Sequence, residues 1–265
     1  MTTIMMQFIG IDFGWMSGPS GLCCLSWENN QLNLIELTRL ESSAKILEWL
    51  DRALSPSQPA MIAIDAPTII NNQTGMRLPD KLAHKHFGKY HAGCYPANLN
   101  RPFAQNTIKL GLNLQQRGFN HAPIIERQKL GRYQIEVFPH PAMINLFKLD
   151  KILKYKKGKL ADRALELNKL RQYIIEILPT LTPSLNILSQ SPQQTEKTPL
   201  CPLCLCGSNL PELPRKGQEL KALEDQLDSL ICAYIGAHWW YWGLDKNLVL
   251  GDEKNGYIVI PQPLS

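Results

Sequence analysis

Residues 7–17 constrain the fold most strongly, because they join a buried-strand pattern to a carboxylate. The apolar, β-branched and aromatic run at residues 8–11 is typical of a central strand. Asp12 follows directly, and Gly10 and Gly14 leave the backbone open on either side of it, where larger side chains would block a ligand. Asp also follows strands as an ordinary turn residue, so this segment alone does not distinguish a site from a turn.

The next elements predict a second aspartate beside the first. Strands over 21–27 and 32–37, joined by a tight polar turn, predict an antiparallel meander with the first strand. A helix beginning after Ser42 then leads to a buried strand over 60–65 that also ends in an aspartate, Asp65. The helical crossover makes this fourth strand a parallel neighbour of the first. Both carboxylates are therefore expected at one edge of the sheet, where open α/β folds bind ligands.

The remaining chain predicts a single α/β/α domain over residues 1–265, with a five-stranded mixed sheet. A long polar and basic insertion after the fourth strand covers 66–130, and the fifth strand, which contains Glu136, covers 133–138. Apolar spacing predicts helices over 160–178 and 220–242. The segment 180–214 is rich in Pro, Ser, Thr and Gln and predicts a flexible loop, and residues 257–260 predict a short final strand.

Net charge, cysteine spacing and the length of apolar runs indicate the cellular compartment and the kinds of partner to expect. The formal charge of +5 permits an acidic partner but is too small for a protein that coats nucleic acid. The seven cysteines lack the even spacing of a disulfide framework, and no secretory signal precedes them, so we expect reduced thiols and a cytoplasmic protein. No apolar run reaches the roughly 18 residues needed to span a bilayer, and we expect no membrane association.

An acidic pair on the last predicted helix completes a set of four carboxylates. Asp225 and Asp228 lie one turn apart on a strip that becomes apolar further along, so they repel each other unless protonated or met by a cation. Acidic residues near a helix N-terminus are also ordinary dipole-stabilising residues. Together with Asp12 and Asp65, however, the pair could bind hard divalent cations, Mg²⁺ or Mn²⁺. Two such ions about 4 Å apart would stabilise both the attacking water and the leaving oxygen of a phosphodiester.

The order of elements resembles the ribonuclease H-like fold, and residues 225–230 are similar to the helical acidic signature of RuvC-type junction resolvases. The whole chain resembles the family known as domain of unknown function 429, described as predicted nucleases of the ribonuclease H fold. The matching pieces are Gly10-Ile-Asp-Phe-Gly14, Ile64-Asp-Ala-Pro67, Arg77-Leu-Pro-Asp80, Glu136-Val-Phe-Pro-His140, Tyr155-Lys-Lys-Gly158 and Glu224-Asp-Gln-Leu-Asp228.

This resemblance implies metal-ligand and catalytic positions for the four aspartates and places Glu136, also catalytic, on the strand beyond Asp65. The helical acid that many ribonucleases H carry after the third strand has no clear counterpart, and Glu41 and Glu48 are the nearest candidates.

Other residues carry weaker signals. Basic residues that could contact a phosphate backbone, or else be ordinary surface charges, are Arg77, Lys81, Arg101, Lys154, Lys156 and Lys157. Cys201, Cys204 and Cys206 form half of a zinc-ribbon pattern without an obvious second pair. Residues that could bind a metal or phosphate, but are expected to be loop residues, are His84, His86, His91 and Cys94. The aromatic run 239–242 could stack bases but is expected to be core or an oligomer contact.

We therefore predict a divalent-metal-dependent nuclease that cleaves DNA or RNA with a metal-activated water. The alternative is a catalytically silent nucleic-acid-binding or scaffold protein on the same fold, with homo-oligomerisation open in either case. A third reading is an ATP-dependent kinase-like protein, because Gly10-Ile-Asp-Phe-Gly14 also resembles the first phosphate motif of sugar kinases, although the chain is short for a duplicated fold.

Overall fold

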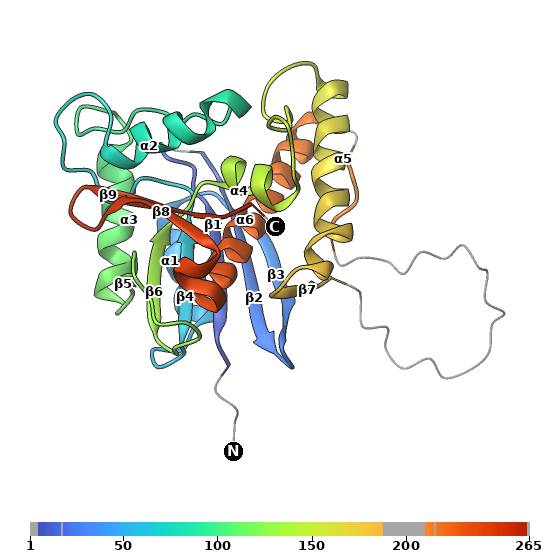
Figure 1. Ribbon diagram of the computed structural model, residues 1–265. Helices are drawn as coiled ribbons and strands as arrows, with labels where there is room; N and C mark the ends of the chain where they lie inside the picture. The colour runs from blue at the N-terminus through green and yellow to red at the C-terminus, as the bar shows by residue number, and fades with distance from the viewer. Residues whose placement is uncertain (1–4, 17, 188–209, 215, 264–265) are drawn as a thin grey trace.

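The computed structural model describes residues 5–16, 18–187, 210–214 and 216–263 of the chain. Its centre is a mixed seven-stranded sheet in the order β5-β6-β4-β1-β2-β3-β7 (Figure 1). The strands of this sheet are β1 (Gln7–Asp12), β2 (Ser20–Glu28), β3 (Gln31–Leu40), β4 (Ala60–Ile64), β5 (Asn120–His121), β6 (Arg132–Glu136) and β7 (Ser184–Asn186).

The pairing of the first four strands agrees with the sequence. β1 runs antiparallel to β2, and β2 runs antiparallel to β3, which gives the predicted meander. β4 runs parallel to β1, with Ile11 opposite Ile64. The next residues along the two strands, Asp12 and Asp65, therefore lie side by side at one edge of the sheet.

The sheet has seven strands, and the prediction of five was wrong. The two additional strands are β5 and β7, which have two and three residues and are too short to show an alternating pattern. β7 lies inside the segment 180–214 that was expected to be a loop, and it pairs parallel to β3. The predicted strand at 257–260 does not join this sheet but belongs to a separate hairpin of β8 (Asn247–Asp252) and β9 (Gly256–Pro261).

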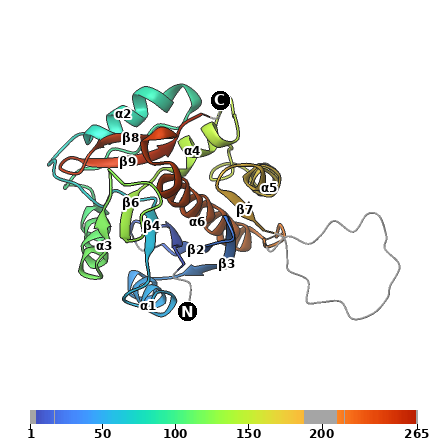
Figure 2. The same cartoon turned by 60° about the horizontal axis from the view of Figure 1, so that its bottom comes forward.

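Helices cover both faces of the sheet. One face packs against α4 (Pro139–Leu146), α5 (Leu160–Glu176) and α6 (Gly217–Trp242), and the other against α1 (Ser43–Ala53) and α3 (Ala104–Gln116). Figure 2 shows α6 running over the sheet, with α1 on the opposite face. The strand pattern explains this division: Phe8 packs with the α6 side, and Ile9 and Ile11 pack with the α1 side.

Two glycines let α6 lie directly on the sheet. A Cβ at Gly10 would lie 1.8 Å from the carbonyl oxygen of Ser229, and one at Gly21 would lie 1.9 Å from that of Asp225. Gly21 pairs with Asp12 in the β1–β2 register. The same contacts that pack the helix therefore bring its acidic residues to the sheet edge where β1 ends. Gly10 makes room for a helix, not for a ligand as its position beside Asp12 suggested.

The insertion 66–130 contains regular structure: α2 (Leu78–Phe87), the 3-10 turn η1 (Gly88–Tyr90), α3 and β5. α2 packs against the β8–β9 hairpin through a small apolar cluster. The remaining 3-10 turns are η2 (Leu178–Thr180) and η3 (Gly243–Asp245). Among the described residues, no helix is both long and apolar enough to cross a membrane. Most of the predicted loop 180–214, with Cys201, Cys204 and Cys206, lies outside the described residues.

Candidate functional site

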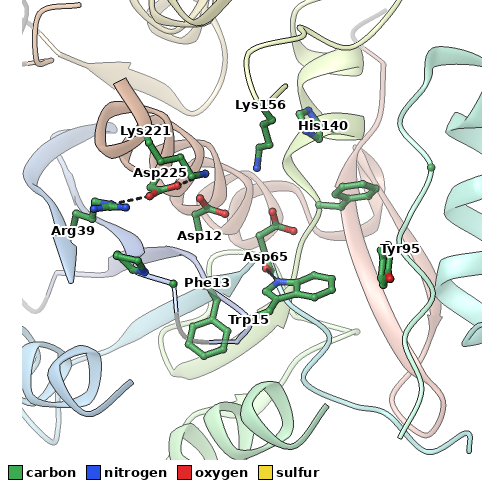
Figure 3. A pocket seen from close by; sticks show the side chains of 15 residues that line it. Asp12, Phe13, Trp15, Arg39, Asp65, Tyr95, His140, Lys156, Lys221 and Asp225 are labelled. Carbon is green, nitrogen blue, oxygen red and sulfur yellow. Dashed lines mark hydrogen bonds and ion pairs between the residues drawn. The ribbon is translucent and has the colours of Figure 1, made fainter. Parts of the chain in front are cut away.

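Asp12 and Asp65 form the centre of the candidate site. Asp12 is the last residue of β1, Asp65 follows β4, and the backbone N–H of Asp65 donates to the carbonyl of Ile11 at 2.9 Å. Both aspartates line a pocket of about 460 Å³ (Figure 3). In the part of the chain that the structure describes, neither carboxylate makes a hydrogen bond or an ion pair with another side chain. These are the carboxylates that a ligand could meet.

The two helical aspartates, by contrast, already have cationic partners. Asp225 pairs with Arg39 Nε at 2.8 Å through one oxygen and with Lys221 Nζ at 2.8 Å through the other. Figure 3 draws both contacts as dashed lines. The predicted repulsion between Asp225 and Asp228 is therefore offset by protein cations.

Asp228 is the most deeply buried of the four aspartates, with 0 % of its surface exposed. The Tyr155 hydroxyl donates to its Oδ1 at 2.6 Å, and Lys156 Nζ forms an ion pair with its Oδ2 at 2.8 Å. Adjacent residues of one loop thus meet the two oxygens of this carboxylate, one by a hydrogen bond and the other by an ion pair, and within the described residues Oδ2 accepts no hydrogen bond. Burial of an ionised carboxylate is costly without such partners.

The four aspartates act on one another electrostatically. Burial raises the pKa of Asp12 well above its usual value; Lys156 opposes the rise, and Asp228, Asp65 and Asp225 add to it. Burial also raises the pKa of Asp65 to about 7, again opposed by Lys156. Burial alone would lower the pKa of Lys156, but Asp228 and Asp12 outweigh it and the pKa lies well above normal. The site therefore holds a charged Lys156 among carboxylates whose combined negative charge this cation does not balance.

Glu136, the fifth predicted acid, is held by a different partner. It ends β6 and accepts two hydrogen bonds from Arg77, from Nη2 at 2.6 Å and from Nη1 at 2.8 Å. Arg77 is 4 % exposed and also pairs with Asp80 at 2.7 Å. Burial raises the pKa of Glu136 to about 7, against the effect of Arg77. Arg77, predicted to bind substrate, is thus buried in an ion-pair network next to Asp65.

The structure separates the other basic residues predicted to bind substrate. Lys156 lines the pocket with Asp12 and Asp65, whereas Lys154 and Lys157 line a separate pocket of about 740 Å³ beside α5. Lys81 is exposed on α2. The guanidinium of Arg101 lies 5.1 Å from the ring centre of Tyr95, which lines the first pocket.

An aromatic wall closes one side of the pocket. The indole N–H of Trp15 donates to the backbone carbonyl of Asp65 at 2.9 Å, which fixes this ring beside the aspartates. Trp15 and Tyr95 both pack on Phe103, with ring centres 4.6 Å and 6.2 Å away, and Tyr95 is 60 % exposed. The aromatic run at 239–242 is not part of this wall; Trp239 is fully buried and donates to the carbonyl of Ala122.

Sequence reasoning did not identify several residues of the pocket. They are Arg39, Lys221, His140, Trp15 and Tyr95, and the same holds for Tyr155, which contacts Asp228 but does not line the pocket. Tyr155 and His140 do occur within two of the segments that carry the family resemblance, and this was the available signal. Burial, with Lys156 nearby, lowers the pKa of His140 to about 4, so this imidazole is neutral near pH 7. Arg39 and Lys221 reach Asp225 from β3 and from the preceding turn of α6, and only the folded arrangement reveals the first of these contacts.

The donor set allows a test of the predicted metal ions. Within residues 5–187 and 210–263, apart from residues 17 and 215, no group of three or more His, Cys, Asp or Glu side chains is arranged to hold a metal ion. Mg²⁺, however, is commonly bound by one or two carboxylates together with water and substrate phosphate. Asp12 and Asp65, two adjacent carboxylates without a side-chain partner in the described ranges and with raised pKa values, fit that mode. They do not fit a site in which all four aspartates share ions.

Comparisons with known proteins agree with the family resemblance. A family described as "Protein of unknown function (DUF429)" matches residues 10–253. No protein with a curated function matches the chain. A solved structure, "T. thermophilus RuvC in complex with Holliday junction substrate", is 15 % identical, with a TM-score of 0.32, over 88 % of this chain and 97 % of that chain.

Proposed function

The chain belongs to the DUF429 family, and we propose that it hydrolyses phosphodiester bonds of DNA or RNA with the help of a divalent cation, Mg²⁺ or Mn²⁺. The observation that carries this proposal is the pair Asp12 and Asp65. Two carboxylates that have no side-chain partner among the described residues lie side by side at the end of parallel strands and face a pocket that also contains Lys156. Burying a pair of carboxylates without a partner lowers the stability of the fold unless a ligand binds them.

Each group around the pocket suits a phosphodiester. Asp12 and Asp65 offer oxygen ligands to a hard cation, which would supply Lewis-acid chemistry by drawing charge from the attacking water and the phosphate. Lys156 offers N–H donors to a phosphate oxygen. Trp15 and Tyr95 offer ring faces against which a base can stack. His140 is neutral near pH 7 and offers a hydrogen-bonding ring nitrogen at the pocket wall.

The arrangement of strands supports the proposal at the level of the fold. A three-stranded meander whose first strand pairs with a parallel fourth strand is the order on which the resemblance to the ribonuclease H-like fold rests. The α6 acids lie across the same sheet edge, because Gly10 and Gly21 allow the helix to approach. We infer that this fold serves here to present Asp12 and Asp65 to a nucleic acid.

A second candidate is a nucleic-acid-binding protein that has no catalytic activity. One observation favours it: among the described residues no three side chains form a ready metal site, and protein cations already meet Asp225 and Asp228. Such a protein would bind nucleic acid equally well with and without divalent cations.

The deciding experiment is a cleavage panel of end-labelled single-stranded, duplex and branched DNA and RNA with Mg²⁺, Mn²⁺ or EDTA. The nuclease proposal predicts cleavage that requires the cation and that Asp12→Asn and Asp65→Asn abolish. Asp150→Asn is the matched control, because Asp150 is exposed and does not line the pocket. Unchanged binding in EDTA, with no cleavage of any substrate, would instead support the silent binding protein.

A further inference from the structure

We propose that the site takes a single divalent cation, at Asp12 and Asp65, and that the ammonium group of Lys156 supplies the second positive charge for the reaction. The proposal deepens the proposed function, because it assigns Lys156 a direct role at the phosphodiester. It departs from the expectation that four aspartates hold two ions. It rests on one observation: within the described residues, protein cations pair with Asp225 and Asp228 but not with Asp12 or Asp65.

Protein cations pair with both helical aspartates. Arg39 and Lys221 take the two oxygens of Asp225. Tyr155 and Lys156 take the two oxygens of Asp228, at 2.6 Å and 2.8 Å. A metal ion at either carboxylate would have to displace a cation from a buried or half-buried contact. Within the described residues, Asp12 and Asp65 are therefore the two aspartates of the four whose carboxylates no protein cation pairs with.

Lys156 is also placed to act outside its ion pair. Its side chain is 34 % exposed, although its partner Asp228 is 0 % exposed, so the ammonium group lies between the buried carboxylate and the open pocket. In Figure 3 the Lys156 side chain points toward Asp12 and Asp65 from the opposite wall. An ammonium group has three donors. The ammonium group pairs with Asp228 Oδ2 by charge at 2.8 Å, and this oxygen accepts no hydrogen bond within the described residues, so the donors of Lys156 are available to a phosphate held in the pocket.

Asp228 and Tyr155 become positioning residues in this arrangement. Asp228 lies on α6, whose approach to the sheet is fixed by Gly10, and it anchors the lysine by a contact with no exposed atoms on the acid. Tyr155 directs the Asp228 carboxylate by donating to the oxygen that Lys156 does not use. The lysine thereby has a fixed position, as a bound ion would, but requires no metal in solution.

The test is the number of Mn²⁺ ions bound by the full chain, measured by electron paramagnetic resonance of free Mn²⁺ at saturating concentration. We expect one ion for the wild type, one for Lys156→Arg, which keeps the charge, and two for Lys156→Met, in which Asp228 lacks its cation. Lys151→Met, a substitution of an exposed lysine outside the pocket, should also bind one. Two ions in the wild type, none in the wild type, or a single ion of unchanged affinity in a folded Lys156→Met would overturn the proposal.

Cleavage gives a second readout. Lys156→Met should cut slower by on the order of 100-fold at saturating Mg²⁺, the size expected for losing one charge-stabilising donor, and Lys156→Arg should recover part of the rate. If Lys156→Met does not fold, the wild-type ion count and the Lys156→Arg variant still decide. If no nucleic acid is cleaved but the ion counts hold, the proposed nuclease function fails while the one-ion site stands.

Discussion

Asp12 and Asp65 stand next to each other one position beyond the paired residues Ile11 and Ile64, and each carboxylate is without a side-chain partner in the described part of the chain. The arrangement costs stability, since both groups are driven toward the protonated form by burial. A fold that retains such a pair gains from a ligand that removes the cost. This link between stability and the site makes the proposals measurable without a known substrate.

The first prediction concerns Asp65 and pH. The folded-state pKa of about 7 lies above the ordinary value of 3.8, so the folded state holds a proton that the unfolded chain releases. The stabilising effect of that proton is complete below about pH 4 and is lost as the pH rises to about 7. In EDTA, Asp65→Asn should therefore be more stable than the wild type at pH 8, by roughly 1–3 kcal/mol.

Paired urea denaturation at pH 5 and pH 8 measures this difference. The advantage of the Asn variant should be smaller at pH 5, and added Mg²⁺ should stabilise the wild type more than the variant, because a ligand stabilises only the state that binds it. An Asn variant that is equally destabilised at both pH values, with the same response to Mg²⁺, would mean that Asp65 has a purely structural role.

The second prediction concerns Gly10. A methyl group there would collide with the α6 backbone, at 1.8 Å from the Ser229 oxygen and 2.4 Å from the Ala233 nitrogen. Neither atom belongs to a flexible side chain, so the helix must move away from β1. We expect Gly10→Ala to lower the free energy of unfolding by about 3 kcal/mol or more. Gly88→Ala is the control, since its Cβ would meet only a His84 carbon at 3.8 Å, and its melting temperature should be close to the wild-type value.

The sequence could predict the central strands and the two strand-end aspartates, because those signals are local. An apolar run ending in Asp, repeated after a helical crossover, is enough to predict that Asp12 and Asp65 are neighbours. The same reasoning could not reveal β5 and β7, whose pairing depends on neighbours already in place rather than on their own two or three residues.

A local sequence pattern could not predict which basic residues pair with the acidic residues of α6. Lys156 and Asp228 are 72 positions apart, and Arg39 and Asp225 are 186 apart, so only the tertiary structure reveals that these charges meet. The sequence also gave no reason to separate Lys156 from Lys157, although the first lines the aspartate pocket and the second lines another. The role of Gly10 was misread for the same reason, since α6 follows it by more than two hundred residues.

The third prediction separates structure from catalysis at Glu136. Arg77→Met leaves two buried carboxylates, Glu136 and Asp80, without their cation and should cost about 3–5 kcal/mol of stability. Glu136→Gln should cost less, because Arg77 keeps its contact with Asp80 at 2.7 Å. Arg127→Met removes an exposed ion pair with Asp245 and should change stability by less than about 1 kcal/mol. Thermal melts of the three variants rank these costs. A Glu136→Gln variant that keeps full stability yet loses all cleavage would instead make Glu136 part of the reaction.

The last prediction concerns Tyr95 and rests on the proposed function. Its ring is 60 % exposed and lines the pocket with Asp12, and Arg101 lies over the ring at 5.1 Å. Bases inside a duplex are already stacked on one another, so a base that stacks on Tyr95 must be unpaired. Tyr95→Ala should therefore weaken binding of a single-stranded oligonucleotide about ten-fold, within the range for one lost stacking contact, and should affect duplex binding less.

Fluorescence anisotropy with labelled oligonucleotides measures this loss, with Ca²⁺ in place of Mg²⁺ so that cleavage does not remove the ligand. Tyr95→Phe should bind as the wild type does, because the ring is retained and only the hydroxyl is lost. Ile124→Ala removes a side chain that is 80 % exposed and does not line the pocket, and it should have no effect. An equal loss of single-strand and duplex binding in Tyr95→Ala would assign the residue to backbone contacts, whereas unchanged binding of both would remove the aromatic wall from the nucleic-acid site.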